Sequence, residues 1–402
     1  MRPENPTVPP SPDLTVAPTL PILGSACRSR SRSTANSKTA LGGTATVVVA
    51  WPIHHWRTVS LGFLFSERIR YRAGMLPDGY KLSGSDVTVP LIGVGTWAWG
   101  DRSTWGMGGY DTTLTRDSIQ GAWDASVDAG AALFDTAEVY GRGESERIIG
   151  HMLARDPQRA ASAVVATKFM PSPWKLQVRG ALLKSLRASL GRLGLPAVDL
   201  YQIHGPISLR SHAALADALA SAHQAGLVKA VGVSNYSVKE THAMSEALRG
   251  RGMRLATNQI EFSLLRRAPE TTGLLAACRE MGVLPMAYSP IGQGRLTGKY
   301  SAAHPPPGKR NFSNHPMAVV EGVVAELRRI GEKHDGKLPS QVALNWVMAK
   351  GVVPIPGAKN RGQAEENAGA LGWHIDEDDL ARLDEAALPG TRTLQARMWQ
   401  HG

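Results

Sequence analysis

The 402-residue sequence is poor in cysteine and contains no long uninterrupted hydrophobic run. Its two cysteines, Cys27 and Cys278, are far apart, which argues against a disulfide framework and suits a reducing compartment. The apolar stretch over residues 40–56 is interrupted by Pro52 and two histidines before it reaches the ~20 residues that a membrane span requires. We therefore predict neither a disulfide-rich protein nor a membrane protein.

The sequence also lacks the motifs of nucleic-acid-binding proteins. Its formal net charge is +11, but residues 1–74 alone contain nine Lys or Arg residues and only three Asp or Glu residues. The remaining chain has no basic run interleaved with aromatic residues, and no zinc-finger or RNA-binding signature. We therefore predict no nucleic-acid partner.

Residues 1–78 differ in composition from the rest of the chain. They are Pro-rich at first, Ser/Arg-rich over residues 27–34, and free of acidic residues between Asp13 and Glu67. This composition is typical of a disordered transit peptide. Two other interpretations fit the same residues: an unstructured tail, or a start codon assigned too far upstream, with Met75 as the true beginning. Residues 79–402 are then the catalytic domain.

From residue 79 onward, strand patterns alternate with helix patterns. A short hairpin is expected at residues 80–90, with Gly84 between two alternating stretches. Eight apolar, β-branched runs follow, at residues 91–96, 132–136, 163–167, 198–203, 229–233, 255–260, 283–288 and 352–355. Helical segments with apolar residues three and four apart lie between them, and one of these opens at Pro339 and closes at Gly351. The alternation predicts an α/β protein, a (β/α)8 TIM barrel with an N-terminal hairpin and a disordered leader.

A doubly wound open sheet is the main competing fold. It would require a Gly-rich dinucleotide loop after the first strand. Gly93 and Gly95 are followed by Thr96, Trp97 and Ala98, so the third glycine of that fingerprint is absent. Both this absence and the count of eight strands favour the barrel.

Polar or aromatic side chains follow nearly every predicted strand. In a (β/α)8 barrel the active site is assembled at the carboxyl ends of the strands. In chain order these residues are Trp97, Asp135, Lys168, His204, Asn235, Gln259, Tyr288 and Lys359. A single strand-end polar group is more often a cap, but six or more around one ring predict an active site.

Four of these strand ends and loops offer the groups needed for proton transfer to a carbonyl. Tyr140 is a phenol, which keeps its proton near neutral pH and can donate it. A neighbouring ammonium stabilises the phenolate, and a buried lysine needs a carboxylate to remain charged. Lys168 and Asp135 match these two requirements, and His204 can orient a carbonyl oxygen as a neutral imidazole.

These motifs together resemble the aldo/keto reductase superfamily. The matching segments, in family order, are GVGTW at residues 93–97, FDTAEVYG at 134–141, ATK at 166–168, LYQIH at 200–204, GVSNY at 232–236, NQ at 258–259, AYSPI at 287–291 and IPGAK at 355–359. Three longer segments, at residues 95–101, 227–237 and 292–300, are most similar to the plastid-type NADP-dependent reductases of plants and algae. That similarity favours the transit peptide and a chloroplast location, with a cytoplasmic one as the alternative.

The resemblance implies an enzyme that reduces aldehydes or ketones with NADPH, and it supports the same catalytic tetrad. It implies that Ser234, Asn235 and Gln259 hold the nicotinamide carboxamide and that Tyr288 stacks on the ring, unless Tyr288 is simply a core aromatic. Residues 289–296 would follow the pyrophosphate, Lys359 would bind the 2′-phosphate, and Glu366 and Asn367 would hold the adenine. Within that segment the implied cofactor residues are Ser289, Pro290, Ile291, Gly294 and Leu296, and those outside it are Lys299, Gly357 and Gln363. Arg361 is either a second phosphate ligand or a solvated surface charge.

Several positions leave the small-molecule carbonyl substrate open. Gly205 and Phe262 stand where related plant reductases often carry a bulky aromatic residue and an aromatic hydroxyl, and Gly205 predicts a wider pocket. The tryptophans at positions 97, 99, 105 and 174 either line an apolar substrate site or pack the loops. No sequence feature predicts the oligomeric state or a bound metal.

Two other functional classes are compatible with parts of the pattern. One is a nicotinamide-binding regulatory or auxiliary subunit with little turnover, which the complete tetrad disfavours. The other is a barrel isomerase or lyase that forms a Schiff base on Lys168, which would leave Tyr140 and Asp135 without a clear purpose.

Overall fold

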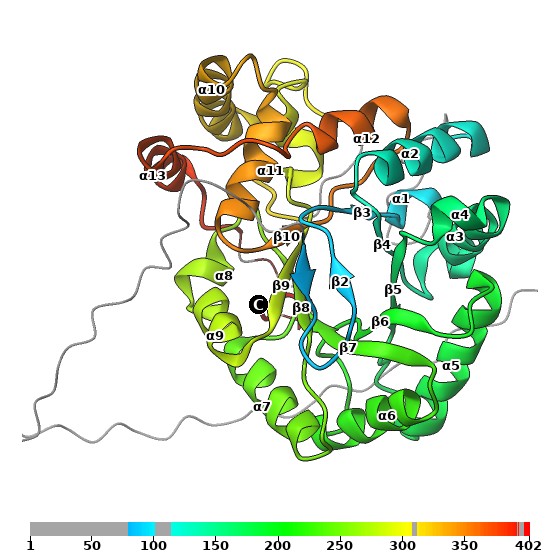
Figure 1. Ribbon diagram of the computed structural model, residues 1–402. Coiled ribbons are helices and arrows are strands. Elements are labelled where there is room, and N and C mark those ends of the chain that lie inside the picture. Colours follow the sequence, from blue (N-terminus) through cyan, green and yellow to red (C-terminus); the bar gives the residue numbers. More distant parts are fainter. Residues whose placement is uncertain (1–78, 101–113, 308–311, 392, 394–397) are drawn as a thin grey trace, which may run out of the picture. The chain divides into compact units, whose positions relative to one another are not determined.

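Eight parallel strands form the ring at the centre of the protein (Figure 1). Each strand pairs with the next one in the chain, from β3 to β10. A parallel bridge between Gly95 and Gly357, with a 2.9 Å hydrogen bond from Gly95 N to Pro356 O, joins the two outer strands. The strands are β3 (Gly93–Gly95), β4 (Leu133–Asp135), β5 (Val164–Phe169), β6 (Val198–Ile203), β7 (Val228–Ser234), β8 (Thr257–Glu261), β9 (Leu284–Tyr288) and β10 (Val353–Pro354). The predicted (β/α)8 barrel and all eight predicted strands are confirmed.

This computed structural model describes residues 79–100, 114–307, 312–391, 393 and 398–402. All of them belong to one compact unit, Ile69–Gly402, whereas the second unit, Met1–Arg68, lies outside the described residues. The predictions about the leader, residues 1–78, also fall outside them and stay predictions.

Helices surround the strands on the outside of the ring (Figure 1). Their helical periodicity places apolar side chains on the inner face, as in α5, where Leu182, Leu186 and Leu190 are buried. The α-helices are α1 (Trp97–Gly100), α2 (Arg116–Asp128), α3 (Glu144–Arg155), α4 (Pro157–Ala160), α5 (Val178–Leu193), α6 (His212–Gln224), α7 (Val238–Arg249), α8 (Ala268–Thr271), α9 (Leu274–Met281), α10 (Met317–Lys333), α11 (Pro339–Ala349), α12 (Arg361–Ala368) and α13 (Glu377–Ala386), and two 3-10 segments are η2 (Tyr140–Gly143) and η3 (Gly292–Thr297). The helix expected to open at Pro339 is α11.

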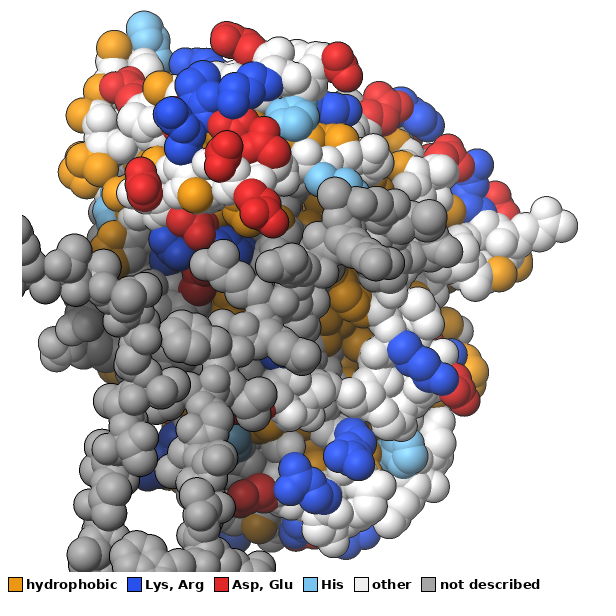
Figure 2. All heavy atoms as spheres, turned by 60° about the vertical axis from the view of Figure 1, so that its left-hand side comes forward, with side chains coloured by type: hydrophobic (Ala, Val, Ile, Leu, Met, Phe, Trp, Pro, Cys, Tyr) orange, Lys and Arg blue, Asp and Glu red, His pale blue; other side chains and the backbone are white. Residues whose placement is uncertain are grey.

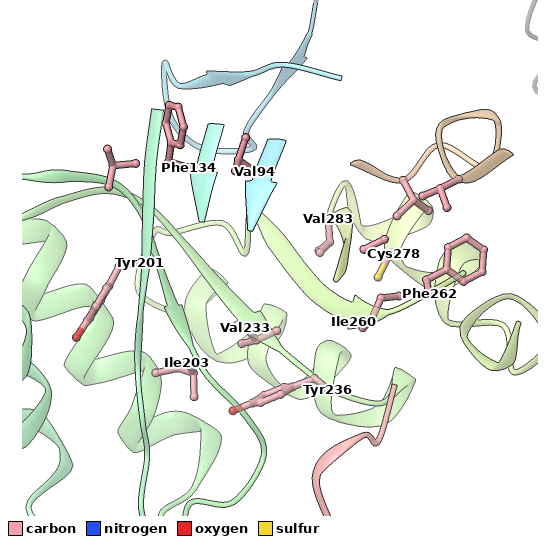
Figure 3. Close-up of a cluster of buried hydrophobic side chains, with 14 of the residues drawn as sticks. Val94, Phe134, Tyr201, Ile203, Val233, Tyr236, Ile260, Phe262, Cys278 and Val283 are labelled. Carbon is pink, nitrogen blue, oxygen red and sulfur yellow. The ribbon is translucent and has the colours of Figure 1, made fainter. Parts of the chain in front are cut away.

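Two layers of apolar side chains form most of the core. The larger layer lies between the strands and the helices, and Figure 3 shows part of it, including Val94, Phe134, Tyr201 and the buried Cys278. Because side chains alternate along a strand, the neighbouring residues on the same strands point into the barrel. Leu200, for example, belongs to the inner layer, whereas Tyr201 belongs to the outer one.

The predicted hairpin is confirmed as β1 (Tyr80–Lys81) paired antiparallel with β2 (Thr88–Val89). Leu82, Val87 and Val89 of this hairpin pack against the inner layer, which includes residues at the beginnings of the barrel strands. The hairpin therefore covers the amino-terminal end of the barrel, and Figure 1 shows it in blue across the ring. The opposite end, where the strands finish, is the end at which an α/β barrel builds its active site.

The outer surface of α10 and α13 is rich in ion pairs. Asp379 accepts hydrogen bonds from Arg329 at 2.5 Å and from Lys333 at 2.9 Å, and Glu326 pairs with Arg329. Side chains of both charges lie side by side in the upper part of Figure 2. No helix in the described part of the chain has the length and apolar character needed to cross a bilayer.

Candidate active site

A cavity of ≈ 920 Å³ lies at the carboxyl ends of the barrel strands. The loops after the strands line it, and most of the residues expected at the site meet there. The predicted residues in its wall are Asp135, Tyr140, His204, Ser234, Asn235, Gln259, Tyr288, Ser289, Pro290, Ile291, Gly294, Lys299, Gly357, Lys359, Gln363, Glu366 and Asn367. Of the other two, Lys168 lies in the barrel directly behind this wall, and the side chain of Leu296 is buried in the core.

Lys168 lies between the Asp135 carboxylate and the Tyr140 phenol. Its Nζ donates to Asp135 Oδ2 at 2.5 Å and to Thr136 O at 2.9 Å, and it lies 3.5 Å from the Tyr140 hydroxyl. The lysine side chain is fully buried, so its ammonium depends on these three oxygens for solvation. Burial lowers the pKa of the Lys168 ammonium, and the Asp135 carboxylate opposes that shift.

A close backbone approach places Tyr140 beside Lys168. The phenol begins η2, which follows β4, and the next residue, Gly141, has a φ of 57°. A Cβ on Gly141 would lie 1.9 Å from the carbonyl oxygen of Gly100 at the end of α1. Glycine is therefore required both for the left-handed backbone and for the contact with α1.

His204 lies on the other side of the phenol, after β6. Its ring meets the Tyr140 ring edge-on, with centroids 5.6 Å apart. Burial, and then the nearby charge of Lys168, hold the pKa of His204 well below its usual range. The imidazole is therefore neutral at physiological pH and can donate a single N–H.

The barrel interior holds the Asp135 carboxylate from a second direction. Gln259 Nε2 donates to Asp135 Oδ1 at 2.8 Å, and Gln202 Nε2 lies 3.4 Å from the same oxygen. Thr257 in turn donates to Gln202 Oε1 at 3.2 Å. Sequence reasoning missed Gln202, although a glutamine within the apolar pattern of β6 was a usable signal, because a buried amide needs partners.

The ends of β7 and β9 form a connected polar floor. Ser234 Oγ donates to Gln259 O at 2.9 Å, Asn235 Nδ2 donates to Ser234 Oγ at 3.0 Å, and the Tyr288 hydroxyl donates to Asn235 Oδ1 at 2.8 Å. Asn235 and Ser289 have positive φ angles of 65° and 51°. Left-handed non-glycine residues are uncommon and gather at functional sites, which supports the expectation that these strand ends bind a ligand.

The far end of the cavity is polar and contains two lysines. Lys359 follows β10, and its backbone N donates to Gln363 Oε1 at 2.9 Å at the start of α12. Glu366 accepts from Lys299 at 3.0 Å, and Asn367 donates to Gly357 O at 3.2 Å. Arg361, by contrast, pairs with Glu365 on the surface and is not among the residues of the cavity wall, which favours the surface-charge interpretation.

The pocket widening expected at Gly205 is not found. The indole of Trp399, from the C-terminal segment 398–402, occupies that space, and a Cβ on Gly205 would lie 2.8 Å from two of its ring carbons. Met398 and Trp399 both line the cavity. Sequence reasoning missed them, and the only signal was an apolar pair near the end of the chain.

The aromatic residues considered for the substrate site do not all lie in the cavity. Trp97 lines the cavity, Trp99 is buried with its Nε1 donating to Ala358 O at 2.7 Å, and Trp174 is 79 % exposed. Trp105 lies outside the described residues. Phe262 is buried and stacks on Trp346 with centroids 5.0 Å apart, so it contributes to the core rather than to the pocket (Figure 3).

One group of side chains in the described residues has the proximity of a metal site. Possible ligand atoms of His334, Asp376 and Asp379 lie within 4.8 Å of one another. The Asp379 carboxylate is already compensated by Arg329 and Lys333, as described above. Because these two basic side chains already neutralise the carboxylate, we assign no metal to this group.

Comparisons with known proteins agree with the family resemblance. The chain is 36% identical over 333 residues to the chloroplastic pyridoxal reductase of Arabidopsis thaliana, covering 80% of this chain and 89% of that protein. It is 31% identical to the L-glyceraldehyde 3-phosphate reductase of Escherichia coli, covering 80% and 94%.

Solved structures show the same similarity. Glycerol dehydrogenase from Gluconobacter oxydans matches with a TM-score of 0.66 and 29% identity, covering 79% of this chain and 98% of that one. An aldo-keto reductase from Klebsiella pneumoniae in complex with NADPH matches with a TM-score of 0.61 and 25% identity, again covering 79% and 98%. Residues 91–388 match the model of the Aldo/keto reductase family. The chain belongs to the aldo/keto reductase family of oxidoreductases.

Proposed function

We propose that this protein reduces aldehydes or ketones to alcohols, with NADPH as the reductant and Tyr140 as the proton donor. The observation that carries the proposal is the position of Lys168 Nζ, 2.5 Å from Asp135 Oδ2 and 3.5 Å from the Tyr140 hydroxyl. Together with a neutral His204, this arrangement offers a proton and an orienting N–H from one side of the cavity.

The cavity suits NADPH in its chemistry as well as its extent. The polar floor at Ser234, Asn235 and Tyr288 offers amide, hydroxyl and aromatic groups for a nicotinamide. At the far end, Lys359 offers a cation for the 2′-phosphate, and Asn367 offers an amide for the adenine. When bound, NADPH would supply the hydride that the carbonyl carbon receives. The reported NADPH complex of the Klebsiella relative supports this assignment.

The chain's own groups would control the proton. The Tyr140 hydroxyl would donate its proton to the carbonyl oxygen, while the neutral His204 would donate an N–H to the same oxygen and orient it. The Lys168 ammonium would then stabilise the phenolate left on Tyr140. Asp135 would keep that ammonium charged in a site where burial favours its neutral form.

A Tyr140→Phe variant tests this function. We expect the rate of NADPH oxidation with a simple aldehyde to fall on the order of 10²–10⁴-fold, because the general acid is removed. NADPH binding, followed by fluorescence titration, should change little. Tyr201→Phe is the matched control, since the Tyr201 hydroxyl is buried outside the cavity and has no hydrogen-bond partner among the described residues.

The same measurements separate this function from its competitor. If Tyr140→Phe reduces good substrates as fast as the parent protein, the proposed mechanism is wrong. Tight retention of NADPH with negligible turnover across a panel of aldehydes and ketones would instead support a nicotinamide-binding regulatory subunit.

For the chain as a whole, we propose that residues 79–402 are the NADP-dependent reductase domain and that residues 1–78 direct it to the chloroplast. The leader's composition and the chloroplastic Arabidopsis relative support this location. Fusion of residues 1–78 to a fluorescent protein in plant or algal cells tests it. Diffuse cytoplasmic fluorescence would favour the cytoplasmic alternative.

A further inference from the structure

We infer that Glu146, a buried carboxylate on the first turn of α3, is a positioning residue for the proposed proton transfer. It acts in two ways: its bonds to Thr167 and Arg192 hold Lys168 and the loop of Tyr140 in place, and its charge favours the Lys168 ammonium. The inference rests on the proposed carbonyl reduction. Glu146 is not among the described residues of the cavity wall, so it acts through other residues.

Glu146 is a fully buried charged side chain between α3 and the sheet. Thr167 Oγ1 donates to its Oε1 at 2.6 Å, and Arg192 Nε donates to its Oε2 at 2.6 Å. The exposed fraction of the Glu146 side chain is 0%, against 21% for Arg192. An apolar residue could fill such a place without the desolvation penalty of a buried carboxylate. The carboxylate therefore calls for a reason other than packing.

The bond to Thr167 fixes the direction of the Lys168 side chain. Thr167 and Lys168 are neighbours on β5, so their side chains point to opposite faces of the strand. Thr167 points outward to Glu146 on α3. Lys168 points into the barrel, toward Asp135 and Tyr140. Holding the Thr167 hydroxyl therefore sets the rotation of β5 where the lysine has to lie between a carboxylate and a phenol.

Arg192 connects Glu146 to the loop that carries Tyr140. The Arg192 side chain packs on Gly143, the last residue of η2, and a Cβ on Gly143 would collide with the Arg192 Nε. Gly143 has a φ of 85°, a backbone conformation that favours glycine. Arg192 also donates to Ser189 Oγ on its own helix, α5, at 3.1 Å. The ion pair of Glu146 and Arg192 therefore holds the end of η2 against α5.

Glu146 also contributes its charge. Burial lowers the pKa of Lys168, and the carboxylates of Asp135 and, more weakly, Glu146 oppose that shift. The titratable groups that face Lys168 among the described residues are Asp135, Tyr140, His204 and Glu146. Because Glu146 makes no direct bond to Lys168, a substitution can remove its charge and leave the direct partners of the ammonium in place.

The first experiment uses Glu146→Gln, which keeps the shape of the side chain and an acceptor for the Thr167 hydroxyl but removes the charge. With the full-length protein, NADPH and a simple aldehyde, we expect kcat to fall at least about tenfold. The alkaline limb of kcat/KM should move to lower pH by at least about half a unit. The sign follows from the charge: losing a negative charge weakens proton binding at Lys168 and at Tyr140, and both must be protonated for the reaction.

Two further variants separate the charge from stability. Glu144→Gln is the matched control on the same turn, because Glu144 is exposed and pairs with Arg147 on the surface, and it should leave kcat and the alkaline limb unchanged. Glu146→Asp keeps the charge but shortens the side chain. It should unfold at lower urea concentration than the parent and yet keep the alkaline limb near the parent position. An alkaline limb shared by Glu146→Asp and Glu146→Gln would contradict the role of the charge.

A variant of the partner tests the positioning, including the case in which Glu146→Gln does not fold. Thr167→Val removes the hydroxyl that joins Glu146 to β5 and leaves the charge in place. We expect kcat to fall roughly fivefold or more, with little change in the KM for NADPH and no shift of the alkaline limb. A kcat equal to that of the parent would show that the bond to Thr167 does not position Lys168.

A titration without turnover separates this inference from the proposed function. The ultraviolet absorbance of the Tyr140 phenolate is obtained as the difference between each protein and the same protein with Tyr140→Phe. The phenolate should appear at lower pH in Glu146→Gln than in the parent. That shift, in a protein that reduces no aldehyde or ketone, would refute the proposed reaction and uphold the action of Glu146 on Tyr140. Equal phenolate midpoints would overturn the inference even if aldehydes are reduced.

Discussion

Gln259 reaches across the barrel to Asp135, with 2.8 Å between its Nε2 and the carboxylate Oδ1. β4 and β8, which carry these two residues, are four strands apart in the eight-stranded sheet and so face each other across the ring. Lys168 holds the other carboxylate oxygen. The orientation of the Asp135–Lys168 pair thus depends on Gln259. The family resemblance assigns the same residue to cofactor binding.

Replacing Gln259 by leucine should destabilise the protein and slow reduction. Asp135 Oδ1 would keep only the longer 3.4 Å contact with Gln202, and an under-satisfied buried carboxylate costs about 1–3 kcal/mol. We expect the free energy of unfolding, measured with urea, to fall by that amount, and kcat to fall with it. Gln224→Leu, at an exposed position on α6, is the control. Unaltered unfolding in Gln259→Leu would show that this hydrogen bond does not hold the carboxylate.

The pH dependence of stability should report on His204. Below about pH 6.5 the unfolded chain binds a proton at this histidine, whereas the native protein, in which the pKa is lowered, does not. Because the unfolded state then holds more protons, the free energy of unfolding should decrease as the pH falls from 7.5 to 5.5. His204→Gln should weaken this dependence, and His223→Gln, at an exposed position, should not. Identical pH profiles in the parent and His204→Gln would rule out the buried neutral imidazole.

The same lowered pKa predicts the shape of the activity profile. His204 should stay neutral and able to orient a carbonyl through the range in which a solvent-exposed histidine titrates. We therefore expect kcat/KM for an uncharged aldehyde to show no decline centred near pH 6.5. Such a decline, present in the parent and absent in His204→Gln, would contradict this expectation.

We expect Lys359 to determine the preference of the enzyme for NADPH over NADH. Removing its ammonium eliminates the proposed partner of the 2′-phosphate, and a charge-assisted contact contributes about 1.5–3 kcal/mol. Lys359→Ala should therefore raise the KM for NADPH at least about tenfold while changing the KM for NADH much less. Arg361→Ala is the neighbouring control, because Arg361 is bonded to Glu365 on the surface. A parent protein that prefers NADH would refute the assignment.

Gln400 Nε2 donates a hydrogen bond to the buried Glu261 Oε2, and we expect this bond to stabilise the position of the C-terminal segment, residues 398–402. Gln400→Ala removes the amide, and Gln400→Glu places a second carboxyl beside a buried one, where like charges repel. The free energy of unfolding, measured with urea, should fall from the parent to Gln400→Ala and fall again in Gln400→Glu. If Gln400→Glu is as stable as the parent protein, the segment is not held through this contact.

Local patterns were sufficient to predict the barrel and much of the candidate site. The eight apolar runs, the intervening helical periodicity and the hairpin are properties of short segments, and each predicted strand is present. Because parallel strands end on the same face, the polar residues that follow them had to meet there. This is why Asp135, Tyr140 and His204 share one cavity, with Lys168 directly behind its wall.

What the sequence by itself determined is therefore the set of strand ends and the groups that they carry. Only the tertiary structure decided which groups contact one another across the ring, as Gln259 and Gln202 do with Asp135. It also decided that Trp399 fills the space left by Gly205, 194 positions earlier in the chain, and that Leu296 faces the core. Such contacts form only when the barrel closes and when the C-terminal segment packs against the cavity. Neither event can be read from the periodicity of the residues involved.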